Sequence, residues 1–259
     1  QTTISTATIT LSSEGLTAPE TIPAGWVEIT FENTAEAPLF GIMGRLDDDA
    51  TMDDFMDALM GIMGGDAGIV PPATFTGAPA AMPGTSQLVT YNLAAGSYIL
   101  LNVAGEEPQI TTFVVEGEAV ESDFEPEADL TVALVDFAFG LPVELPAGEQ
   151  IWKIENLGDQ WHELIAIPVP DGTTLEDALL LLMAVEGEGE GEEESEGGMP
   201  EFAAAWSPMS AGERAWIQVD LAPGTYLVTC FIPDANSDEH AIHAALGMIQ
   251  IVTVTEPED

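Results

Sequence analysis

The segment Leu221-Ala-Pro-Gly-Thr-Tyr-Leu-Val-Thr-Cys230 decides the fold of this chain. It begins with a Pro-Gly turn and continues as a short apolar, β-branched run, which is the pattern of a strand that follows a tight turn. Leu93-Ala-Ala-Gly-Ser-Tyr98 repeats its first six positions with two conservative changes. The two copies indicate that the chain contains an internal duplication.

A second pair of motifs extends the duplication toward the start of each copy. Ile22-Pro-Ala-Gly25 and Ile29-Thr-Phe-Glu-Asn33 match Leu145-Pro-Ala-Gly148 and Trp152-Lys-Ile-Glu-Asn156, with the same spacing inside each pair. A match that keeps its spacing without a gap indicates that each copy is one structural unit rather than a chance recurrence of turn residues.

We therefore expect two homologous domains, at residues 1–116 and 128–259. The acidic segment 117–127 has the composition of a linker. The two copies differ in their insertions. An apolar Gly/Pro/Ala segment over residues 61–82 predicts a loop in the first copy. The acidic tract 186–196 predicts a solvated loop in the second, because it has no residue that could enter a core.

Short strand-forming runs separated by turns fill both copies. Trp26-Val-Glu-Ile-Thr-Phe31 and Trp216-Ile-Gln-Val-Asp-Leu221 are examples, rich in β-branched and aromatic residues. Many short strands with Pro and Gly turns are typical of an all-β sandwich. We therefore predict one β-sandwich for each copy.

Each copy also carries the signal of one short inserted helix. Thr51 and Thr174 have the character of N-caps, and each is followed three residues later by a carboxylate. After Thr51 the apolar residues recur at helical spacing, and these are Met52, Phe55, Met56, Leu59, Met60 and Met63. The methionines could suggest a Cu(I) motif, but the interleaved Phe and Leu favour core packing.

The charge of the chain is extreme, with 46 acidic residues, 3 basic residues and a net charge of −43. Such a chain cannot neutralise phosphates, which excludes nucleic acid and anionic membranes as partners. Acidic surface loops such as 47–49 could take up calcium, although they lack the spacing of an EF-hand.

Two features bear on where the protein works. No stretch of the chain is apolar for long enough to predict a transmembrane helix. The sequence starts at Gln1 rather than Met, which we interpret as the end left after removal of a signal peptide. We therefore expect an extracellular, periplasmic or cell-surface location.

Cys230 is the only cysteine, so the chain cannot form an internal disulfide. His243 and Met248 follow it, and His162 lies upstream. One cysteine, two histidines and a weak axial methionine form the ligand set of a blue-copper site. The alternatives are a buried inert thiol and a zinc site built on His240 and His243 with a nearby carboxylate.

The second copy resembles the cupredoxin family over most of its length. The resemblance runs from Asp136-Phe-Ala-Phe-Gly-Leu-Pro-Val-Glu-Leu-Pro-Ala-Gly148 to Trp161-His162, and from Ala222 through Cys230 to His243-Ala-Ala-Leu-Gly-Met248. It implies two tandem Greek-key sandwiches and one mononuclear copper. It also implies that His162, Cys230 and His243 are equatorial ligands, with Met248 as the axial ligand.

The chain departs from the family pattern in several places. The interval between Cys230 and His243 is long, and Glu163 follows the first histidine where many cupredoxins have Asn. In the first copy, Leu39 stands at the position of His162 and Asn102 at that of Cys230. The first copy therefore cannot hold this type of copper.

These observations favour a secreted copper protein that transfers single electrons to or from a basic redox partner. The chain contains no catalytic constellation, so we do not expect an enzyme. The alternative is an extracellular structural subunit of a filament or surface layer, with a vestigial metal site and neighbouring copies of itself as partners. The strand-forming N-terminus, residues 1–11, would supply the contact in that case.

Overall fold

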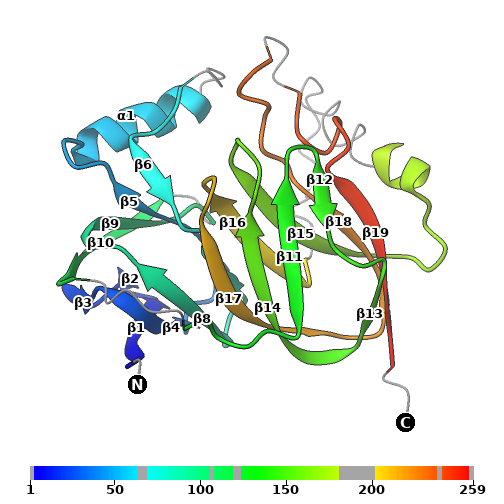
Figure 1. Ribbon diagram of the computed structural model, residues 1–259, viewed down its shortest axis with the longest axis horizontal. Coiled ribbons are helices and arrows are strands. Elements are labelled where there is room, and N and C mark those ends of the chain that lie inside the picture. The colour runs from blue at the N-terminus through cyan, green and yellow to red at the C-terminus, as the bar shows by residue number, and fades with distance from the viewer. Residues whose placement is uncertain are drawn as a thin grey trace.

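The protein is all-β, as the sequence predicted (Figure 1). The computed structural model describes residues 3–63, 69–104, 108–118, 124–180, 202–237 and 241–256. In the first repeat the strands are β1 (Ser5–Ser12), β2 (Gly15–Thr17), β3 (Thr21–Pro23), β4 (Gly25–Asn33), β5 (Leu39–Leu46), β6 (Ala73–Phe75), β7 (Ala80–Ala81), β8 (Ser86–Leu93), β9 (Gly96–Asn102) and β10 (Gln109–Glu116).

The second repeat follows the same order. Its strands are β11 (Leu130–Val135), β12 (Ala138–Gly140), β13 (Glu144–Pro146), β14 (Gly148–Asn156), β15 (His162–Val169), β16 (Ala204–Met209), β17 (Arg214–Leu221), β18 (Gly224–Thr229) and β19 (Ile249–Thr255). The segment Leu221–Cys230 therefore contains the turn from β17 into β18, and Leu93–Tyr98 contains the equivalent turn from β8 into β9.

Both predicted helices form where their capping residues stand. Helix α1 (Met52–Met63) begins after Thr51, whose hydroxyl accepts a hydrogen bond from the Asp54 amide at 3.2 Å while the Asp54 carboxylate accepts one from the Thr51 amide at 2.9 Å. Thr174 and Asp177 make the same reciprocal pair at 3.0 and 3.2 Å before the helical residues 175–180. Each pair satisfies amide groups that the first helical turn leaves without partners.

One sheet runs through both repeats. Its eight strands lie in the order β12-β11-β14-β17-β8-β4-β1-β2, so β8 of the first repeat pairs directly with β17 of the second (Figure 1). The other layer consists of a six-stranded sheet, β3-β10-β9-β5-β6 with β7 on β5, and a five-stranded sheet, β13-β19-β18-β15-β16.

The β8–β17 contact relates the two repeats by a local two-fold axis. Val89 pairs with Ile217 in antiparallel register. These two residues occupy equivalent positions, because each lies four residues before the leucine of the duplicated turn motif. Antiparallel pairing of equivalent residues places a two-fold axis between them. The predicted boundaries of the domains stay a prediction, since the sheet continues across them.

The second layer is also joined across the repeats. Isolated bridges link Thr76 with Met209 and Pro79 with Trp206, and the Ala78 amide donates to the Ser207 hydroxyl at 2.8 Å. These contacts come from residues 61–82, which the sequence predicted as a loop. That prediction was wrong for the part that contains β6 and β7, because both pair with β5 of the same repeat, a strand distant in sequence that a local pattern does not reveal.

The predicted linker is held against the eight-stranded sheet where the structure describes it. The Phe124 ring lies edge-on to Trp26 at 5.4 Å. The Glu125 carboxylate lies 2.7 Å from the Arg214 guanidinium and 3.5 Å from the Lys153 amine. Two of the three basic residues of the chain are therefore used to fix this one segment.

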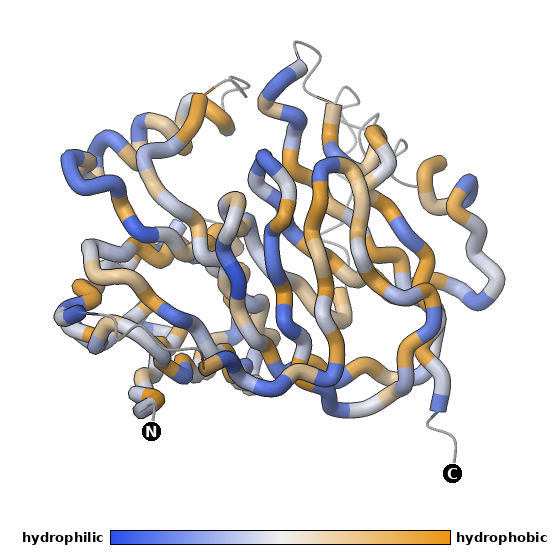
Figure 2. Tube along the Cα trace, in the orientation of Figure 1, coloured by the Kyte–Doolittle hydropathy of each residue, from blue (hydrophilic) through white to orange (hydrophobic). Residues whose placement is uncertain are grey.

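A single hydrophobic cluster extends through both repeats. It includes Ile29 and Leu100 in the first repeat and Trp152, Val228 and Cys230 in the second. Hydrophobic and hydrophilic residues alternate along the strands, so one face of each sheet enters this core (Figure 2). The candidate ligand Cys230 is thus part of the packed interior rather than of a surface loop.

Substitution of Gly77 tests the contact between the repeats. Gly77 has φ of +73°, and a Cβ atom there would collide with the Trp206 indole. Gly84 has φ of +75° and open space around it. We expect Gly84→Ala to lower the free energy of unfolding by about 1 kcal/mol through backbone strain alone. Gly77→Ala should lower it by about 2 kcal/mol more, because the indole must move.

Denaturant unfolding of both variants measures these values. Gly84→Ala is the matched control, since it imposes the same backbone strain without the collision. Equal losses in the two variants would show that the packing of Trp206 against Gly77 does not hold the repeats together.

Candidate metal centre

The structure brings three of the four predicted ligands together. His162 is the first residue of β15, Cys230 directly follows β18, and His243 lies in the segment that leads to β19. β15 and β18 are hydrogen-bonded neighbours, and so are β18 and β19. The three residues therefore start from adjacent strands at the same end of one sheet. Each of them is fully buried.

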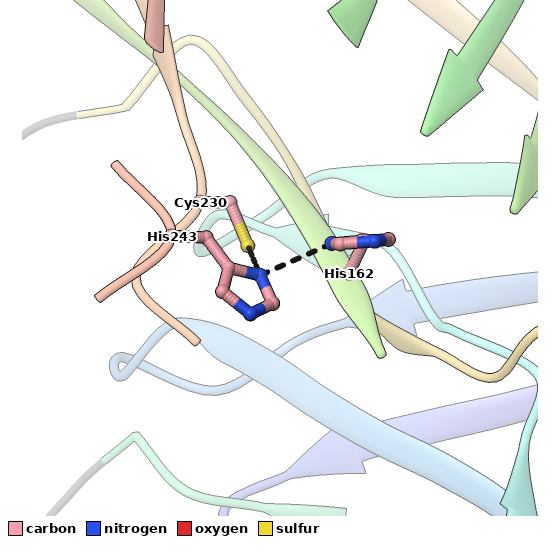
Figure 3. A group of neighbouring side chains, drawn as sticks. All are labelled: His162, Cys230 and His243. Carbon is pink, nitrogen blue, oxygen red and sulfur yellow. Dashed lines mark hydrogen bonds between the residues drawn. The ribbon is translucent and has the colours of Figure 1, made fainter. Parts of the chain in front are cut away.

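The donor atoms of the three side chains converge on one point (Figure 3). The Nδ1 atoms of His162 and His243 lie 3.1 Å apart, and the Cys230 Sγ lies 3.5 Å from the His243 Nδ1. Metal–nitrogen and metal–sulfur bonds of about 2.0 and 2.3 Å at tetrahedral angles would place such atoms roughly 3.3 to 3.6 Å apart. Two of the three separations are therefore close to those of a metal site, all three donor atoms lie within 4.8 Å of one another, and the residue types fit copper.

Main-chain hydrogen bonds close the long interval between Cys230 and His243. The His243 amide donates to the Ile232 carbonyl at 2.8 Å, the Ala244 amide to the Cys230 carbonyl at 3.0 Å, and the Asp234 amide to the Ala241 carbonyl at 2.9 Å. The two described parts of the interval, 231–237 and 241–243, thus pair with each other as the arms of a hairpin. Both ends of the hairpin lie at the metal centre, so the unusual length does not separate the two ligands.

Met248 is linked to the same loop through its backbone. Its amide donates to the His243 carbonyl at 2.8 Å, and its carbonyl accepts from the Cys230 amide at 3.3 Å. The side chain is fully buried in the main core cluster. Its role as axial ligand stays a prediction.

Glu163 pins the ligand loop where the resemblance led us to look for Asn. Its carboxylate accepts a hydrogen bond from the Phe231 amide at 2.9 Å, and its own amide donates to Cys230 Sγ at 3.5 Å. A carboxylate therefore makes the connection between the first histidine and the residue after the cysteine. Burial raises the pKa of Glu163 to about 7, although the bond from Phe231 acts against this shift.

His162 has a second partner on the side away from the cluster. Its Nε2 lies 2.9 Å from the Asp136 carboxylate, which also accepts hydrogen bonds from the Asp159 and Gln160 amides at 3.1 and 3.3 Å. The Gln160 side chain in turn donates to the Asp234 carboxylate at 2.9 Å. This network connects the turn after β11, the loop before β15 and the ligand hairpin.

Burial governs the protonation of the cluster. It lowers the pKa of His243 to about 4, with the nearby His162 as a further cause, and it lowers the pKa of His162 in spite of Asp136. Burial also raises the pKa of the Cys230 thiol. Both imidazoles are therefore neutral near pH 7 and can donate a lone pair, while a metal ion would have to displace the thiol proton.

The hydrogen bonds of this cluster do not balance without a further group. Asp136 can only accept, so the proton of neutral His162 resides on Nε2 and its Nδ1 is an acceptor. If His243 Nδ1 donates to it, then His243 Nε2 is left as an unpaired acceptor. Within the described residues, that atom is indeed buried with no partner. A cation bound by the two Nδ1 atoms would replace the hydrogen bond between them, and the proton of neutral His243 would then reside on Nε2, which still has no partner among the described residues.

The first repeat keeps the framework of the site with different chemistry. The Asn102 side-chain oxygen, at the position of the Cys230 sulfur, accepts a hydrogen bond from the Phe40 amide at 2.9 Å. Glu163, the equivalent of Phe40, offers its amide to Cys230 in the same way. Leu39 fills the place of His162 and is fully buried. An apolar and an amide side chain thus replace two of the metal donors.

The remaining candidates lie outside the described residues, belong to helix α1 or stay predictions. His240 and the acidic tract 186–196 lie outside the described residues. Met52 and Met56 pack against the cluster around Phe55, as predicted, but Met60 is 61% exposed, so core packing was the wrong prediction for it. The calcium sites at acidic loops stay a prediction. Among the described residues, no helix is long and apolar enough to cross a membrane.

Comparison with known proteins gives likenesses to solved structures alone, since no family model and no curated protein match the chain. Auracyanin from the photosynthetic bacterium Roseiflexus castenholzii is 19% identical, with a match that covers 49% of this chain and 95% of that protein at a TM-score of 0.32. Copper nitrite reductase from Nitrosomonas europaea is 11% identical, covering 100% of this chain and 96% of that protein at a TM-score of 0.26.

A multi-copper oxidase from Pediococcus acidilactici is 10% identical, covering 98% of this chain and 59% of that protein at a TM-score of 0.28. The structural neighbours are cupredoxins and multicopper proteins. The sequence resemblance pointed to the same family.

The residues around the ligands could not be recognised from the sequence pattern. Asp136 and Asp234 gave no signal, because carboxylates are everywhere in so acidic a chain, and Gln160 belongs to no motif. Comparison of the two repeats could have found one of them. Asp136 aligns with Ser13 and Gly158 with Ala35, so two unlike positions accompany the change from His162 to Leu39.

The raised pKa of Glu163 predicts a pH effect on stability in the metal-free protein. The folded state binds this proton more tightly than the unfolded state, so the Glu163 contribution favours folding at low pH and is lost as pH rises from 4.5 to about 7. We expect Glu163→Gln to remove this dependence. Relative to the variant, the free energy of unfolding of the wild type should fall by on the order of 3 kcal/mol as pH rises through that range.

Denaturant unfolding of both proteins across this pH range measures the difference. Thr229→Val is the control, because Thr229 is buried and does not titrate. Its free energy of unfolding should depend on pH in the same way as that of the wild type. Parallel curves for Glu163→Gln and the wild type would show that the buried carboxylate does not change its proton affinity on folding.

Proposed function

We propose that the protein is a one-electron carrier that holds a single copper ion between His162, Cys230 and His243, with Met248 as the axial ligand. One observation carries this proposal: the two Nδ1 atoms and the Sγ atom are gathered in one fully buried cluster, within 4.8 Å of one another. Copper bound there would supply a Cu(I)/Cu(II) couple, for which a thiolate and two imidazoles are suitable ligands.

Electron transfer rather than substrate chemistry agrees with the burial of the cluster. His162, Cys230 and His243 are all fully buried, and rigid strands or a hydrogen-bonded hairpin hold each of them. A site held in this way changes little between two oxidation states, so little reorganisation accompanies transfer of an electron. A substrate, in contrast, would need an open coordination position that it could reach.

Copper loading followed by visible spectroscopy tests the metal centre. We expect about one copper per chain and an intense charge-transfer band in the visible region, because thiolate coordination to Cu(II) produces one. Cys230→Ser should abolish the band, since an alkoxide or hydroxyl ligand cannot supply the sulfur orbital. Metal analysis before and after loading gives the stoichiometry.

Thr229→Val is the matched control for this experiment. Thr229 precedes Cys230 and is fully buried, and its hydroxyl has no partner among the described residues. The substitution therefore alters the interior next to the site without removing a donor atom. A band that survives Cys230→Ser, or a wild type that takes up no copper, would contradict the proposal.

The net charge indicates the class of redox partner. A chain with charge −43 attracts a basic partner at long range, and salt screens that attraction. We expect the second-order rate of reduction by a basic cytochrome c to fall steeply with ionic strength. With ferrocyanide, an anionic reductant, the rate should instead rise. Stopped-flow absorbance at low and at high ionic strength measures both reduction rates. If both rates change in the same direction with ionic strength, electrostatic steering is ruled out.

Location outside the cytoplasm and assembly with copies of the same chain stay predictions. The strand that was expected to pair with a neighbouring subunit is β1. It is hydrogen-bonded in parallel to β4 over Ser5–Leu11, with β2 on its other edge from Thr10 onward. This N-terminal segment is therefore built into the sheet of its own chain.

A further inference from the structure

We infer that Asp136 is a positioning residue of the metal centre, whose carboxylate fixes the tautomer and the ring orientation of His162. In this arrangement the Nε2–H of His162 donates to Asp136 and the Nδ1 lone pair faces Cys230 and His243. The effect on a bound metal rests on the proposed function above, whereas the effect on the tautomer does not.

The carboxylate of Asp136 is held by a set of converging donors. His162 Nε2 lies 2.9 Å from Oδ1, and the amides of Asp159 and Gln160 donate to the same oxygen at 3.1 and 3.3 Å. The two amides belong to the loop that leads into His162. The backbone thus fixes the acceptor and the imidazole relative to each other, so that the ring cannot turn without breaking the network.

The turn that presents Asp136 has an unfavourable backbone conformation. Asp136 and Phe137 form the two-residue connection between Val135 of β11 and Ala138 of β12. Phe137 has φ of +61° and is the only non-glycine residue with positive φ among the described residues. Gly or Asn usually occupies such a position, because a bulky side chain is strained there.

The strained turn places one residue against each imidazole. Asp136 contacts His162, and the Phe137 ring lies edge-on to the His243 ring at 5.2 Å. Gly247, in the loop that carries His243, has φ of +120°, and a Cβ atom there would come within 3.2 Å of the Phe137 carbonyl oxygen. Strain that persists at a packed site is a mark of a functional constraint.

Gly158 makes room for the Asp136–His162 contact. A Cβ atom at this position would collide with the Asp136 carboxylate and with His162 Nε2, which lies 2.6 Å from the ideal Cβ position. Alanine, the smallest alternative, is therefore excluded while both partners are present. In the first repeat, where neither partner exists, the equivalent residue is Ala35.

The two repeats thus differ at three coupled positions. The second repeat has Asp136, Gly158 and His162. The first has Ser13, Ala35 and Leu39 at the equivalent places. Loss of the imidazole in one copy accompanies loss of its acceptor and of the glycine that accommodates the pair. This comparison within one chain supports a joint role for the acidic residue and the histidine, rather than a role of Asp136 in the turn alone.

The tautomer of His162 in metal-free protein tests the inference directly. Long-range proton–nitrogen correlation NMR distinguishes Nε2–H from Nδ1–H. We expect His162 to be the Nε2–H tautomer in the wild type. Asp136→Asn keeps an acceptor oxygen and should retain this tautomer. Asp136→Ala removes the acceptor and should produce a mixture of tautomers or the Nδ1–H form.

Copper-loaded protein supplies a second readout. Loss of a partner that orients a metal ligand lowers metal affinity by roughly 10- to 100-fold, which is the loss expected for Asp136→Ala in competition with a chelator. Asp136→Asn should lose less copper affinity than Asp136→Ala. Its reduction potential should rise, because removal of a negative charge next to a ligand disfavours Cu(II) relative to Cu(I). A purely structural role for Asp136 would not shift the potential in this way.

Asp159→Asn is the matched control. The side chain is exposed, while the backbone amide that holds Asp136 is unchanged. The variant should keep the wild-type tautomer, affinity and potential. An effect as large as that of Asp136→Ala would overturn the inference, because it would show that any loss of charge near the site has the same result.

Two other results would also overturn it. One is an Nδ1–H tautomer of His162 in the wild type. The other is an Asp136→Ala variant with the wild-type tautomer and copper affinity. If Asp136→Ala does not fold, Asp136→Asn decides, since an unchanged potential would refute the role of the carboxylate. If the wild type binds no copper, the proposed function fails, and the tautomer measurements still decide the role of Asp136.

Discussion

The candidate metal centre depends on the main-chain hydrogen bonds that close the segment between Cys230 and His243. The amide of His243 is held by Ile232, and that of Ala244 by Cys230. Without these bonds the interval would be a long loop, whose closure costs entropy and whose ends would have no fixed separation. Because the hairpin closes at its base, its length is irrelevant to the geometry of the two ligands. The hydrogen bonds of this loop continue to Met248, whose amide donates to the His243 carbonyl, and the chain then enters β19.

The first repeat contributes structure to a site that it no longer contains. Its residues 75–79 pair with β16 of the second repeat, and its Phe75 ring lies 4.8 Å from Trp161, the residue before His162. The eight-stranded sheet joins the repeats in the other layer. Duplication thus supplied a packing partner. Leu39 and Asn102 occupy two of the ligand positions in the first copy, where both side chains are buried.

Burial has opposite consequences for the fold and for the metal site. Placing His162, Cys230 and His243 in the interior removes water from polar atoms that cannot all find protein partners, which is unfavourable for the metal-free protein. The same burial keeps both imidazoles neutral and available as ligands. A metal that binds the folded chain and not the unfolded chain would therefore stabilise the fold. Stability and electron transfer would then share one set of residues.

The sequence by itself determined the elements of this protein and the chemical identity of its candidate ligands. Turn residues, β-branched runs and the capping residues Thr51 and Thr174 are local signals, since neighbours in the chain decide whether a strand or helix can form. Only the tertiary structure decided the pairing of β8 with β17, the strands within residues 61–82, and the contact of Asp136 with His162. Such contacts depend on which surfaces the whole chain can bury together. A single sequence records no such choice, because residues that meet in space can lie far apart along the chain.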